Sequence, residues 1–539
     1  MVVSAHRLAS EVGVDVLKRG GNAVDAAVAV GYALAVTFPA AGNLGGGGFM
    51  LIRLADGRHT FIDFREVAPG AATADMFLDA NGNVIPEMSL RTYRAAGVPG
   101  TVAGLEYARE TFGTQARRTL MAPAINLARR GFVLDQGDAD LLAEAADDFA
   151  KDPPSAQIFL NRGRPFRAGE RLIQTDLARS LQLISDGGAK AFYEGPIAAR
   201  IVAASRANDG IFTLADFAAY RARELQPVEC EYRGYRIISA PPPSSGGVVI
   251  CLTLNILEAY PIGDLGFHSA RSAHYIYEAW RRAYRDRNLN LGDPSFVNAD
   301  VARFVDKTYA ASLRDGISAD RATPSLSLGG VTAKPEGRNT THYSIVDAEG
   351  NAVAVTYTLN DSFGSRLTPP GVGFLLNNEM DDFAAKPGAS NLYGLVEGAQ
   401  NAIEPGKRPL SSMAPTIVTR DGKLTMVLGT PGGSRIPTAV SQVLMNVIDH
   451  GMTVQEAVNA PRLHHQWLPD EAMYERFALS ADTRAALEAR GHTLKEVGFQ
   501  NHMAAILVGA PAINAKPAGR NRLYGAIDPR VNTGAALGH

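Results

Sequence analysis

The chain has 539 residues, of which 46% are hydrophobic and 20% are charged, and it carries 53 Lys and Arg residues against 55 Asp and Glu residues. This composition is typical of a globular protein with a large core and excludes extended disorder. The basic residues are scattered, so charge gives no case for a nucleic-acid partner and favours a small neutral or zwitterionic substrate. Length alone allows several domains or one large architecture.

Cysteine content and hydropathy narrow the class further. The only two cysteines, Cys230 and Cys251, are too few for a disulfide framework or a cysteine metal site, and we expect a buried pair of free thiols. The longest apolar stretch, residues 23–36, contains Asp25 and falls short of the ~20 residues that span a bilayer, so no membrane span is expected. Residues 1–20 are interpreted as an amphipathic helix and lack the pattern of a signal peptide.

The first predicted elements are helical. A Gly-Gly pair at 20–21 stops one helix, and Asn22 can cap the next, which is apolar on all sides and should lie in a core before it ends at Pro39. The glycine-rich run 42–48 leads into a short buried strand at 49–52. Neither sequence pattern of a phosphate-binding loop fits this run, which argues against nucleotide binding.

The middle of the chain is punctuated by two irregular segments. Residues 241–247, rich in Pro, Ser and Gly, predict a rigid turn before a buried element at 248–254. Residues 324–339 have no hydrophobic period and predict a loop. Neither a G-x-S-x-G nucleophile turn nor an H-E-x-x-H metal pair is present, and the adjacent His464 and His465 are interpreted as structural rather than as metal ligands.

A hairpin is predicted directly after this loop. Residues 340–346 and 352–359 alternate in polarity and are rich in β-branched and aromatic residues, and turn-forming residues separate them. If the turn is symmetric, Thr340 lies opposite Thr358. Thr340, Thr358 and Asn360 then share a polar face, while the apolar side chains point to a core. Taken alone, a Thr that begins a strand is structural, because threonine is a good strand former.

The hairpin resembles the start of the small subunit of the γ-glutamyltransferases, also called γ-glutamyl transpeptidases or glutathione hydrolases. The resemblance covers almost the whole chain and is carried by the following segments: GGNAVDAA (20–27), LGGGGFM (44–50), DFRE (63–66), PSSGG (243–247), TTHYS (340–344), LNNEMDDF (376–383), RPLSSM (408–413), PGGSR (431–435) and LYG (523–525). Motifs in this order are specific for the superfamily. They are less specific for one substrate, since some acylases share the same series of motifs.

The resemblance implies an α+β fold, the four-layer αββα sandwich of the N-terminal-nucleophile hydrolases. It further implies that a precursor cuts itself between Asn339 and Thr340, and that residues 1–339 and 340–539 remain associated as large and small subunits of one folded unit. The chemistry agrees with this scheme, because a threonine hydroxyl is a weak nucleophile that needs an adjacent base. A new N-terminal amine, with an ordinary pKa of about 7.7–8.0, supplies that base on the same residue.

By the same resemblance, the catalytic residues surround this new terminus. Thr340 is the nucleophile, and Thr358 supports it by a hydrogen bond. Gly432 and Gly433 match the positions whose backbone amides stabilise the tetrahedral oxyanion. A Pro-Gly-Gly segment without this match would be interpreted as a turn.

The resemblance implies one group of residues that binds the substrate carboxylate, a second group that binds its ammonium, and a lid loop over both. The resemblance assigns the substrate α-carboxylate to Arg65, Ser411 and Ser412, and the α-ammonium to Asn360, Glu379 and Asp382. Some family members have Gln where Glu379 stands, so the site here gains a carboxylate. Residues 384–407 resemble the lid loop of bacterial members, and Tyr393 matches its gating residue.

The implied reaction is attack of Thr340 on a γ-glutamyl amide such as glutathione, followed by transfer of the γ-glutamyl group to water or an amino acid. No cofactor and no metal are required. The alternative on the same nucleophile is a glutaryl-type acylase of β-lactam side chains, and the alternative from another class is a non-catalytic binding protein. The resemblance implies a periplasmic or secreted location.

Overall fold

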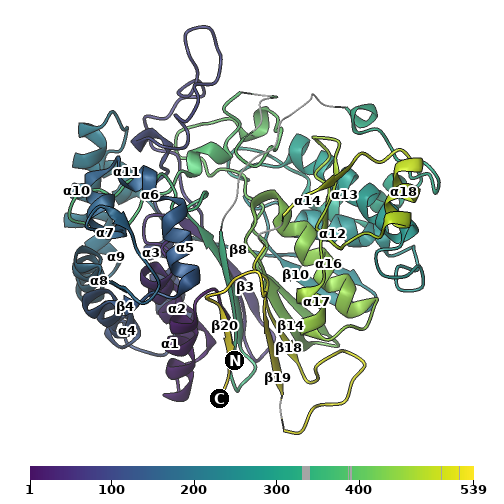
Figure 1. The fold of residues 1–539 in the computed structure, drawn as a ribbon, viewed down its shortest axis with the longest axis horizontal. Coiled ribbons are helices and arrows are strands. Elements are labelled where there is room, and N and C mark those ends of the chain that lie inside the picture. Colours follow the sequence, from purple (N-terminus) through teal and green to yellow (C-terminus); the bar gives the residue numbers. More distant parts are fainter. Residues whose placement is uncertain (330–339, 387, 389–390, 499–500, 521) are drawn as a thin grey trace.

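The computed structural model describes residues 1–329, 340–386, 388, 391–498, 501–520 and 522–539. Two antiparallel sheets pack face to face, and helices cover the outer face of each (Figure 1). Strands β11 (Thr341–Val346) and β12 (Ala352–Thr358) of one sheet pack against β14 (Lys423–Gly429) and β18 (Ala504–Val508) of the other. The predicted four-layer αββα sandwich is confirmed.

Each sheet contains strands from both sides of the segment 330–339. The seven-stranded sheet has the order β20 (Ala535–Leu537), β1 (Val2–Ser4), β11, β12, β2 (Gly47–Arg53), β3 (His59–Phe64) and β8 (Arg223–Leu225). The six-stranded sheet has the order β19 (Leu523–Ile527), β18, β14, β13 (Thr416–Arg420), β10 (Tyr235–Ser239) and β9 (Val228–Tyr232). The parts of the chain before and after this segment therefore share one hydrogen-bonded framework.

The remaining strands of the described residues form three small sheets. They pair β4 (Phe132–Val133) with β7 (Arg171–Leu172), β5 (Leu160–Asn161) with β6 (Arg164–Pro165), and β16 (Ala472–Tyr474) with both β15 (Leu463–His464) and β17 (Leu494–Glu496).

The helices divide into two outer layers (Figure 1). Those beside the seven-stranded sheet are α1 (Arg7–Lys18), α2 (Ala23–Thr37), α3 (Thr101–Phe112), α4 (Arg117–Arg130), α5 (Gln136–Glu144), α6 (Ala146–Phe149), α7 (Pro153–Phe159), α8 (Thr175–Gly187), α9 (Ala189–Tyr193), α10 (Pro196–Ala207) and α11 (Leu214–Ala219). Those beside the six-stranded sheet are α12 (Gly246–Leu257), α13 (Ala270–Asn290), α14 (Val301–Val305), α15 (Lys307–Arg314), α16 (Ile436–Ile448), α17 (Val454–Asn459) and α18 (Ala481–Ala489).

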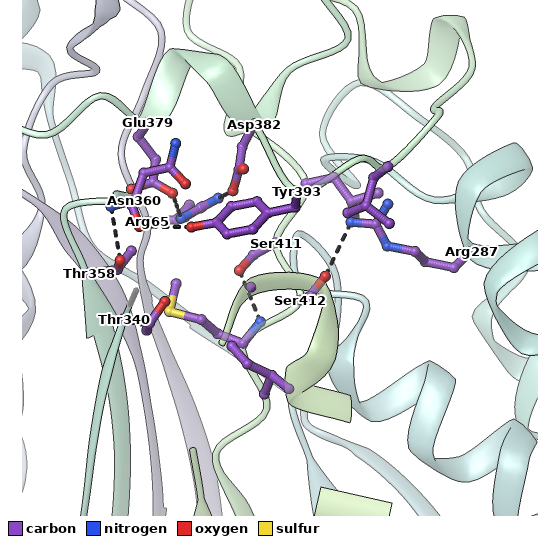
Figure 2. A pocket seen from close by; sticks show the side chains of 15 residues that line it. Arg65, Arg287, Thr340, Thr358, Asn360, Glu379, Asp382, Tyr393, Ser411 and Ser412 are labelled. Atoms are coloured by element: carbon purple, nitrogen blue, oxygen red, sulfur yellow. Dashed lines mark hydrogen bonds and ion pairs between the residues drawn. The ribbon is translucent and has the colours of Figure 1, made fainter. Parts of the chain in front are cut away.

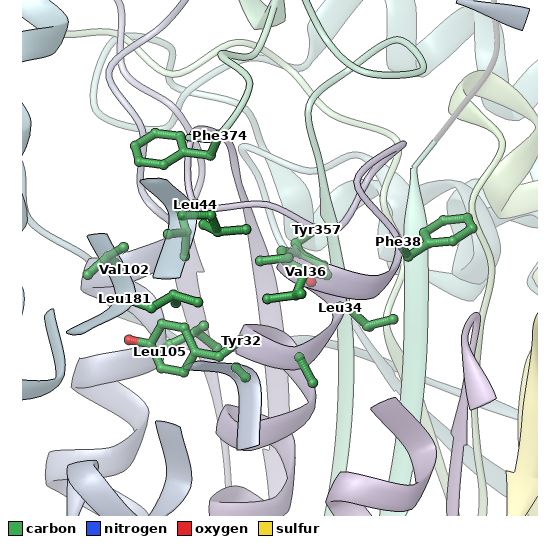
Figure 3. Close-up of a cluster of buried hydrophobic side chains, with 14 of the residues drawn as sticks. Tyr32, Leu34, Val36, Phe38, Leu44, Val102, Leu105, Leu181, Tyr357 and Phe374 are labelled. Carbon is green, nitrogen blue, oxygen red and sulfur yellow. The ribbon is translucent and has the colours of Figure 1, made fainter. Parts of the chain in front are cut away.

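Helix α2 is the central helix of the first layer, and every one of its residues is buried. Asn22 caps it with a reciprocal capping box, as predicted. Its side chains pack among those of α3 and α8 and against the hairpin (Figure 3). Two tyrosines of the hairpin, Tyr343 and Tyr357, donate hydrogen bonds of 3.0 Å to α2 backbone carbonyls. The hairpin that carries Thr340 is thus fixed to a buried helix.

The predicted hairpin and its register are confirmed. Strands β11 and β12 pair with Thr341 opposite Tyr357, which is the register that a symmetric turn requires. Continued by one residue, this register places Thr340 opposite Thr358. Between the sheets, the Ser344 hydroxyl donates to the Ala504 carbonyl at 3.0 Å.

Two local predictions are wrong or incomplete. The amphipathic helix expected over residues 1–20 begins only at Arg7, because Val2–Ser4 pair as strand β1 between β11 and β20. The cysteines are not free thiols, because Cys230 and Cys251 form a disulfide. Strand β9 carries one and helix α12 the other, and only the packing of α12 on β9 brings residues 21 positions apart within bonding distance. None of the helices that the structure describes combines the length and apolarity of a membrane crossing.

We expect the disulfide to stabilise the fold measurably. Closing a loop across a separation of 21 residues restricts the unfolded chain and is worth about 3 kcal/mol in the loop-entropy estimate. The double variant Cys230→Ser/Cys251→Ser should therefore unfold at lower urea concentration than the wild type, and added reductant should shift only the wild type. Two titratable thiols in denatured, unreduced wild-type protein would contradict the disulfide.

Candidate active site

One cavity is lined by most of the predicted site residues (Figure 2). Ten of them line it: Arg65, Thr340, Thr358, Asn360, Glu379, Asp382, Tyr393, Ser411, Ser412 and Gly433. Gly432 precedes the last of these directly in the chain. Asn339 lies outside the described residues. Folding thus brings together side chains separated by more than three hundred sequence positions.

Thr340 lies at the start of the hairpin, one residue before β11, and only 4% of it is exposed. Thr358, at the end of the neighbouring strand, accepts a hydrogen bond of 2.9 Å from the Asn360 backbone amide through its hydroxyl. The Asn43 side chain donates to the Thr358 carbonyl at 2.9 Å. The glycine-rich segment before β2 therefore supports the end of the hairpin where the predicted nucleophile lies.

Arg65 follows directly on strand β3, and its guanidinium is buried at the bottom of the cavity. One of its terminal nitrogens pairs with Glu379 and the other with Asp382, both on a short 3-10 turn (Glu379–Asp382). Its Nε donates to the Pro409 carbonyl at 3.3 Å, and Glu66 lies 3.7 Å from its Nη1. The resemblance assigns Arg65 to the substrate carboxylate and the two acids to its ammonium, and the structure adds that Arg65 and the acids pair with each other.

Burial shifts the pKa values in this cluster. It raises the pKa of Glu66 to about 7 and that of Glu379 well above its ordinary range, although Arg65 acts on both in the opposite direction. Burial also lowers the pKa of Arg65, but Glu379 and Asp382 more than offset this, so the guanidinium stays charged. The cluster therefore combines a permanent cation with carboxyl groups whose ionisation depends on a partner charge.

Three buried oxygen acceptors around the cavity have no hydrogen-bond partner among the described residues. They are Asn360 Oδ1, Glu379 Oε2 and Asp382 Oδ1. Buried polar atoms are almost always paired, because an unmade hydrogen bond costs about 1–3 kcal/mol. An alkylammonium group carries three N–H donors. Three unpaired acceptors on one cavity therefore match that group in number and in sign of charge.

The two serines and Gly433 line the rest of the cavity, and Gly432 precedes Gly433 in the chain. The Ser411 hydroxyl accepts from the Met413 amide at 3.1 Å, and the Ser411 backbone is fixed to the Pro243 carbonyl at 2.8 Å. Gly432 and Gly433 have φ angles of +131° and +54°, in the region that L side chains rarely adopt. A Cβ on Gly433 would lie 2.2 Å from the Tyr393 ring, so only glycine permits this approach.

Tyr393 covers the cavity from the predicted lid. Its hydroxyl donates to the Asn360 carbonyl at 2.7 Å, and its own carbonyl accepts from the Gln466 side chain at 3.1 Å. The ring is 7% exposed. The segment that carries it is thus closed over Thr358 and Asn360 in this structure.

Sequence reasoning missed two polar residues at the site. Arg287, on α13, lines the cavity and donates to the Ser412 hydroxyl at 3.4 Å. Asp381 lies under the lid, where it accepts from the Ser89 hydroxyl at 2.6 Å and the Leu392 amide at 2.9 Å. No local pattern distinguishes either from an ordinary surface charge, because the partners that bury Arg287 and half-bury Asp381 are not adjacent to them in sequence.

Comparison with known proteins agrees with this geometry. Residues 9–538 match the model of the family described as gamma-glutamyltranspeptidase. The chain belongs to the γ-glutamyltranspeptidase family. The resemblance seen in the sequence is thereby confirmed, and the chain is an enzyme of the γ-glutamyltranspeptidase family.

Two relatives and one solved structure are similar to the chain over nearly its whole length. The glutathione hydrolase proenzyme of Pseudomonas sp. (strain A14) is 59% identical over 540 residues, which cover 100% of this chain and 94% of the relative. That of Escherichia coli (strain K12) is 50% identical over 532 residues, covering 98% and 90%. The crystal structure of cephalosporin acylase from Bacillus halodurans superposes with a TM-score of 0.85 at 27% identity, covering 100% of this chain and 96% of that one.

Replacing Arg65 tests its part in substrate binding. A lysine keeps the charge but cannot form two parallel bonds, so Arg65→Lys should raise KM for a γ-glutamyl anilide by about tenfold or more while the protein still matures. Steady-state kinetics measure this, and Arg223→Lys, in an ion pair with Asp63 outside the cavity, serves as the matched control. Unchanged KM and kcat in Arg65→Lys would remove Arg65 from the site.

Proposed function

We propose that the chain is a γ-glutamyltransferase and glutathione hydrolase that cleaves γ-glutamyl amides through a threonyl ester and passes the γ-glutamyl group to water or an amino acid. The observation that carries this proposal is the set of unpaired acceptors on Asn360, Glu379 and Asp382, beside the Arg65 guanidinium. A γ-glutamyl group ends in one ammonium and one carboxylate on the same carbon. These residues supply the complementary charges within one cavity.

Substrate binding exchanges partners within the charged cluster. In the structure, Arg65 is neutralised by Glu379 and Asp382. The α-carboxylate of the substrate binds the Arg65 guanidinium with the help of the two serines, Ser411 and Ser412. The α-ammonium then donates hydrogen bonds to the two acids and to Asn360. The substrate adds one positive and one negative charge, so binding fills the unpaired acceptors without changing the net charge of the buried cluster.

Maturation precedes turnover in this mechanism. The chain is cut between Asn339 and Thr340 into pieces of 1–339 and 340–539, which remain one unit because both contribute strands to both sheets. The freed Thr340 amine takes the proton of the Thr340 hydroxyl as its oxygen attacks the γ-carbonyl carbon. The word proenzyme in the names of both relatives supports this step.

The remaining residues stabilise the oxyanion, orient the nucleophile and shield the cavity from solvent. The backbone amides of Gly432 and Gly433 stabilise the negative oxygen of the tetrahedral intermediate, and Thr358 orients Thr340 from the opposite strand. As the intermediate collapses, the Thr340 ammonium returns its proton to the leaving nitrogen, which departs as the amine product. The γ-glutamyl ester remains, and water or an amino-acid amine then attacks it. Tyr393 and the lid cover the intermediate between the two steps.

We further propose a periplasmic or secreted location. The disulfide between Cys230 and Cys251 supports it, because disulfides persist in oxidising compartments and are rare in the cytosol. Family resemblance points the same way.

Matched γ-glutamyl and glutaryl anilides test the function. Glutaryl keeps the terminal carboxylate but lacks the α-ammonium, so its binding leaves the three acceptors on Asn360, Glu379 and Asp382 without substrate partners, at about 1–3 kcal/mol or more for each unmade bond. We expect kcat/KM for γ-glutamyl to exceed that for glutaryl at least about a hundredfold, since about 1.36 kcal/mol corresponds to tenfold.

Asp382→Asn provides the internal check on this comparison. The substitution removes a charge that faces the ammonium but keeps an acceptor. It should therefore reduce the ratio of the γ-glutamyl to the glutaryl kcat/KM, chiefly by lowering kcat/KM for the γ-glutamyl anilide. Comparable wild-type kcat/KM values for the two anilides would reject the γ-glutamyl assignment and favour the glutaryl-type β-lactam acylase.

A further inference from the structure

Arg287 is a second buried guanidinium of the cavity, where it lies beside Ser412 (Figure 2). It bonds to several segments of the chain at once. From α13 it donates to the hydroxyl of Ser245 at 3.1 Å and to that of Ser412 at 3.4 Å. It also donates to its neighbour Asn288 at 2.9 Å and forms an ion pair with Glu397. Ser245 in turn donates through its backbone amide and hydroxyl to the Ser411 carbonyl, at 2.8 and 2.7 Å.

Glu397 brings the lid into this network. It belongs to residues 391–401, here named the lid arm, which also carry Tyr393. The second oxygen of Glu397 accepts from the Asn401 side chain, which also donates to the Asp382 carbonyl at 2.6 Å. The backbone amide of Gly398, the residue after Glu397, donates to the Asn288 carbonyl at 3.1 Å. A continuous polar chain therefore runs from Ser412, through the lid arm, to Asp382.

The two ends of this chain are the two halves of the proposed substrate site. Ser412 belongs to the carboxylate side and Asp382 to the ammonium side. The ion pair in the middle is almost completely buried, with side-chain exposures of 1% for Arg287 and 3% for Glu397. Neutralising one partner leaves the other charge buried and uncompensated. Movement of the lid arm away from α13 would expose that charge to water and so lower the free energy.

We propose that Arg287 and Glu397 form a latch that fastens the lid arm to α13 and keeps the carboxylate-binding and ammonium-binding halves of the substrate site in register. This inference rests on the proposed function, in which both halves read one substrate. Arg287 is a positioning residue in this scheme, since it acts through Ser412 and Glu397. The hydrogen bonds of Arg287 and Glu397 go to Ser245, Asn288, Ser412 and Asn401 and not to the proposed nucleophile or oxyanion glycines, so loss of the latch should weaken substrate binding more than it slows the chemical step.

Two conservative variants test the latch. Arg287→Lys keeps the charge but cannot bond to Glu397 and Ser412 together, and Glu397→Gln keeps the shape but removes the charge. Each should raise KM for a γ-glutamyl anilide by about tenfold while kcat stays within about threefold. Because both changes break one pair, the double variant should raise KM by less than the product of the single effects.

Hydrogen exchange supplies a readout that needs no substrate. Peptides covering 391–401 should exchange on the order of tenfold faster in both single variants than in the wild type, with no change over β11 and β12. The matched controls are Arg285→Lys, on the same helix with a pairing to Asp286, and Glu404→Gln, on the lid loop with a pairing to Lys407. Neither control should alter KM or exchange in the lid arm.

The outcomes separate the latch from the proposed function. Unchanged KM and unchanged exchange in both variants would overturn the latch, as would a fall in kcat at constant KM or equal effects in the controls. If the wild type fails to prefer γ-glutamyl over glutaryl, the proposed function fails, whereas exchange of the lid arm still decides whether the ion pair holds it. If Glu397→Gln does not fold, Arg287→Lys alone carries both measurements.

Discussion

Thr340→Ala should remain a single chain of 539 residues and lose activity on the order of 10⁴-fold, whereas the wild type should separate under denaturing conditions into pieces of 339 and 200 residues. Alanine has no hydroxyl to attack the preceding carbonyl, so the mechanism predicts that neither cleavage nor acyl transfer occurs. A denaturing gel with mass determination reports the first result, and a γ-glutamyl anilide assay reports the second.

Neighbouring substitutions control this result. Thr341→Ala changes the same residue type one position along β11 and should still be cut. Thr340→Ser keeps a hydroxyl at the same position and should be cut as well, since serine also serves as an N-terminal nucleophile. Cleavage of Thr340→Ala at the same bond would show that another protease acts there.

The second large effect is expected at the oxyanion glycines. Gly432→Ala or Gly433→Ala should lower kcat by about 10²–10³-fold with little change in KM, because each amide must point at the developing oxyanion. A Cβ at Gly432 would lie 2.1 Å from the Asn501 side chain, and one at Gly433 meets the Tyr393 ring. At each position either the backbone or the neighbouring side chain would have to shift.

A third glycine separates strain from catalysis. Gly422, in the turn between β13 and β14, also has a positive φ of +74°, but a Cβ there meets no atom within 4 Å. Gly422→Ala therefore carries a comparable backbone strain outside the cavity and should keep its kcat. Equal losses at all three glycines would assign the effect to folding.

Much of the site could be predicted from sequence because its geometry is local or repeats a known series of motifs. The alternation of residues 340–359 was sufficient for the hairpin and its register, since side chains alternate strictly along strands. The roles of Arg65 and the two glycines came only from the resemblance. Neither residue type carries a functional signal by itself.

The sequence was insufficient where contacts are formed between distant elements. Cys230 and Cys251 bond only because α12 packs on β9, and no pattern around either residue records that packing. The ion pairs of Arg65 with Glu379 and Asp382, and of Arg287 with Glu397, join residues more than one hundred positions apart. Burial decides what these charges do, and burial is a property of the assembled layers.

The most direct test of the whole account is covalent labelling with a diazoketone shaped like glutamine, which loses dinitrogen when a nucleophile attacks its reactive carbon. The label should appear once, on the first residue of the fragment that begins at Thr340, as located by peptide mass spectrometry. The analogue without the α-amino group should fail to label at the same concentration, because Asn360, Glu379 and Asp382 then lack their ammonium partner. A label on any other residue, or equal labelling by the two compounds, would contradict the account.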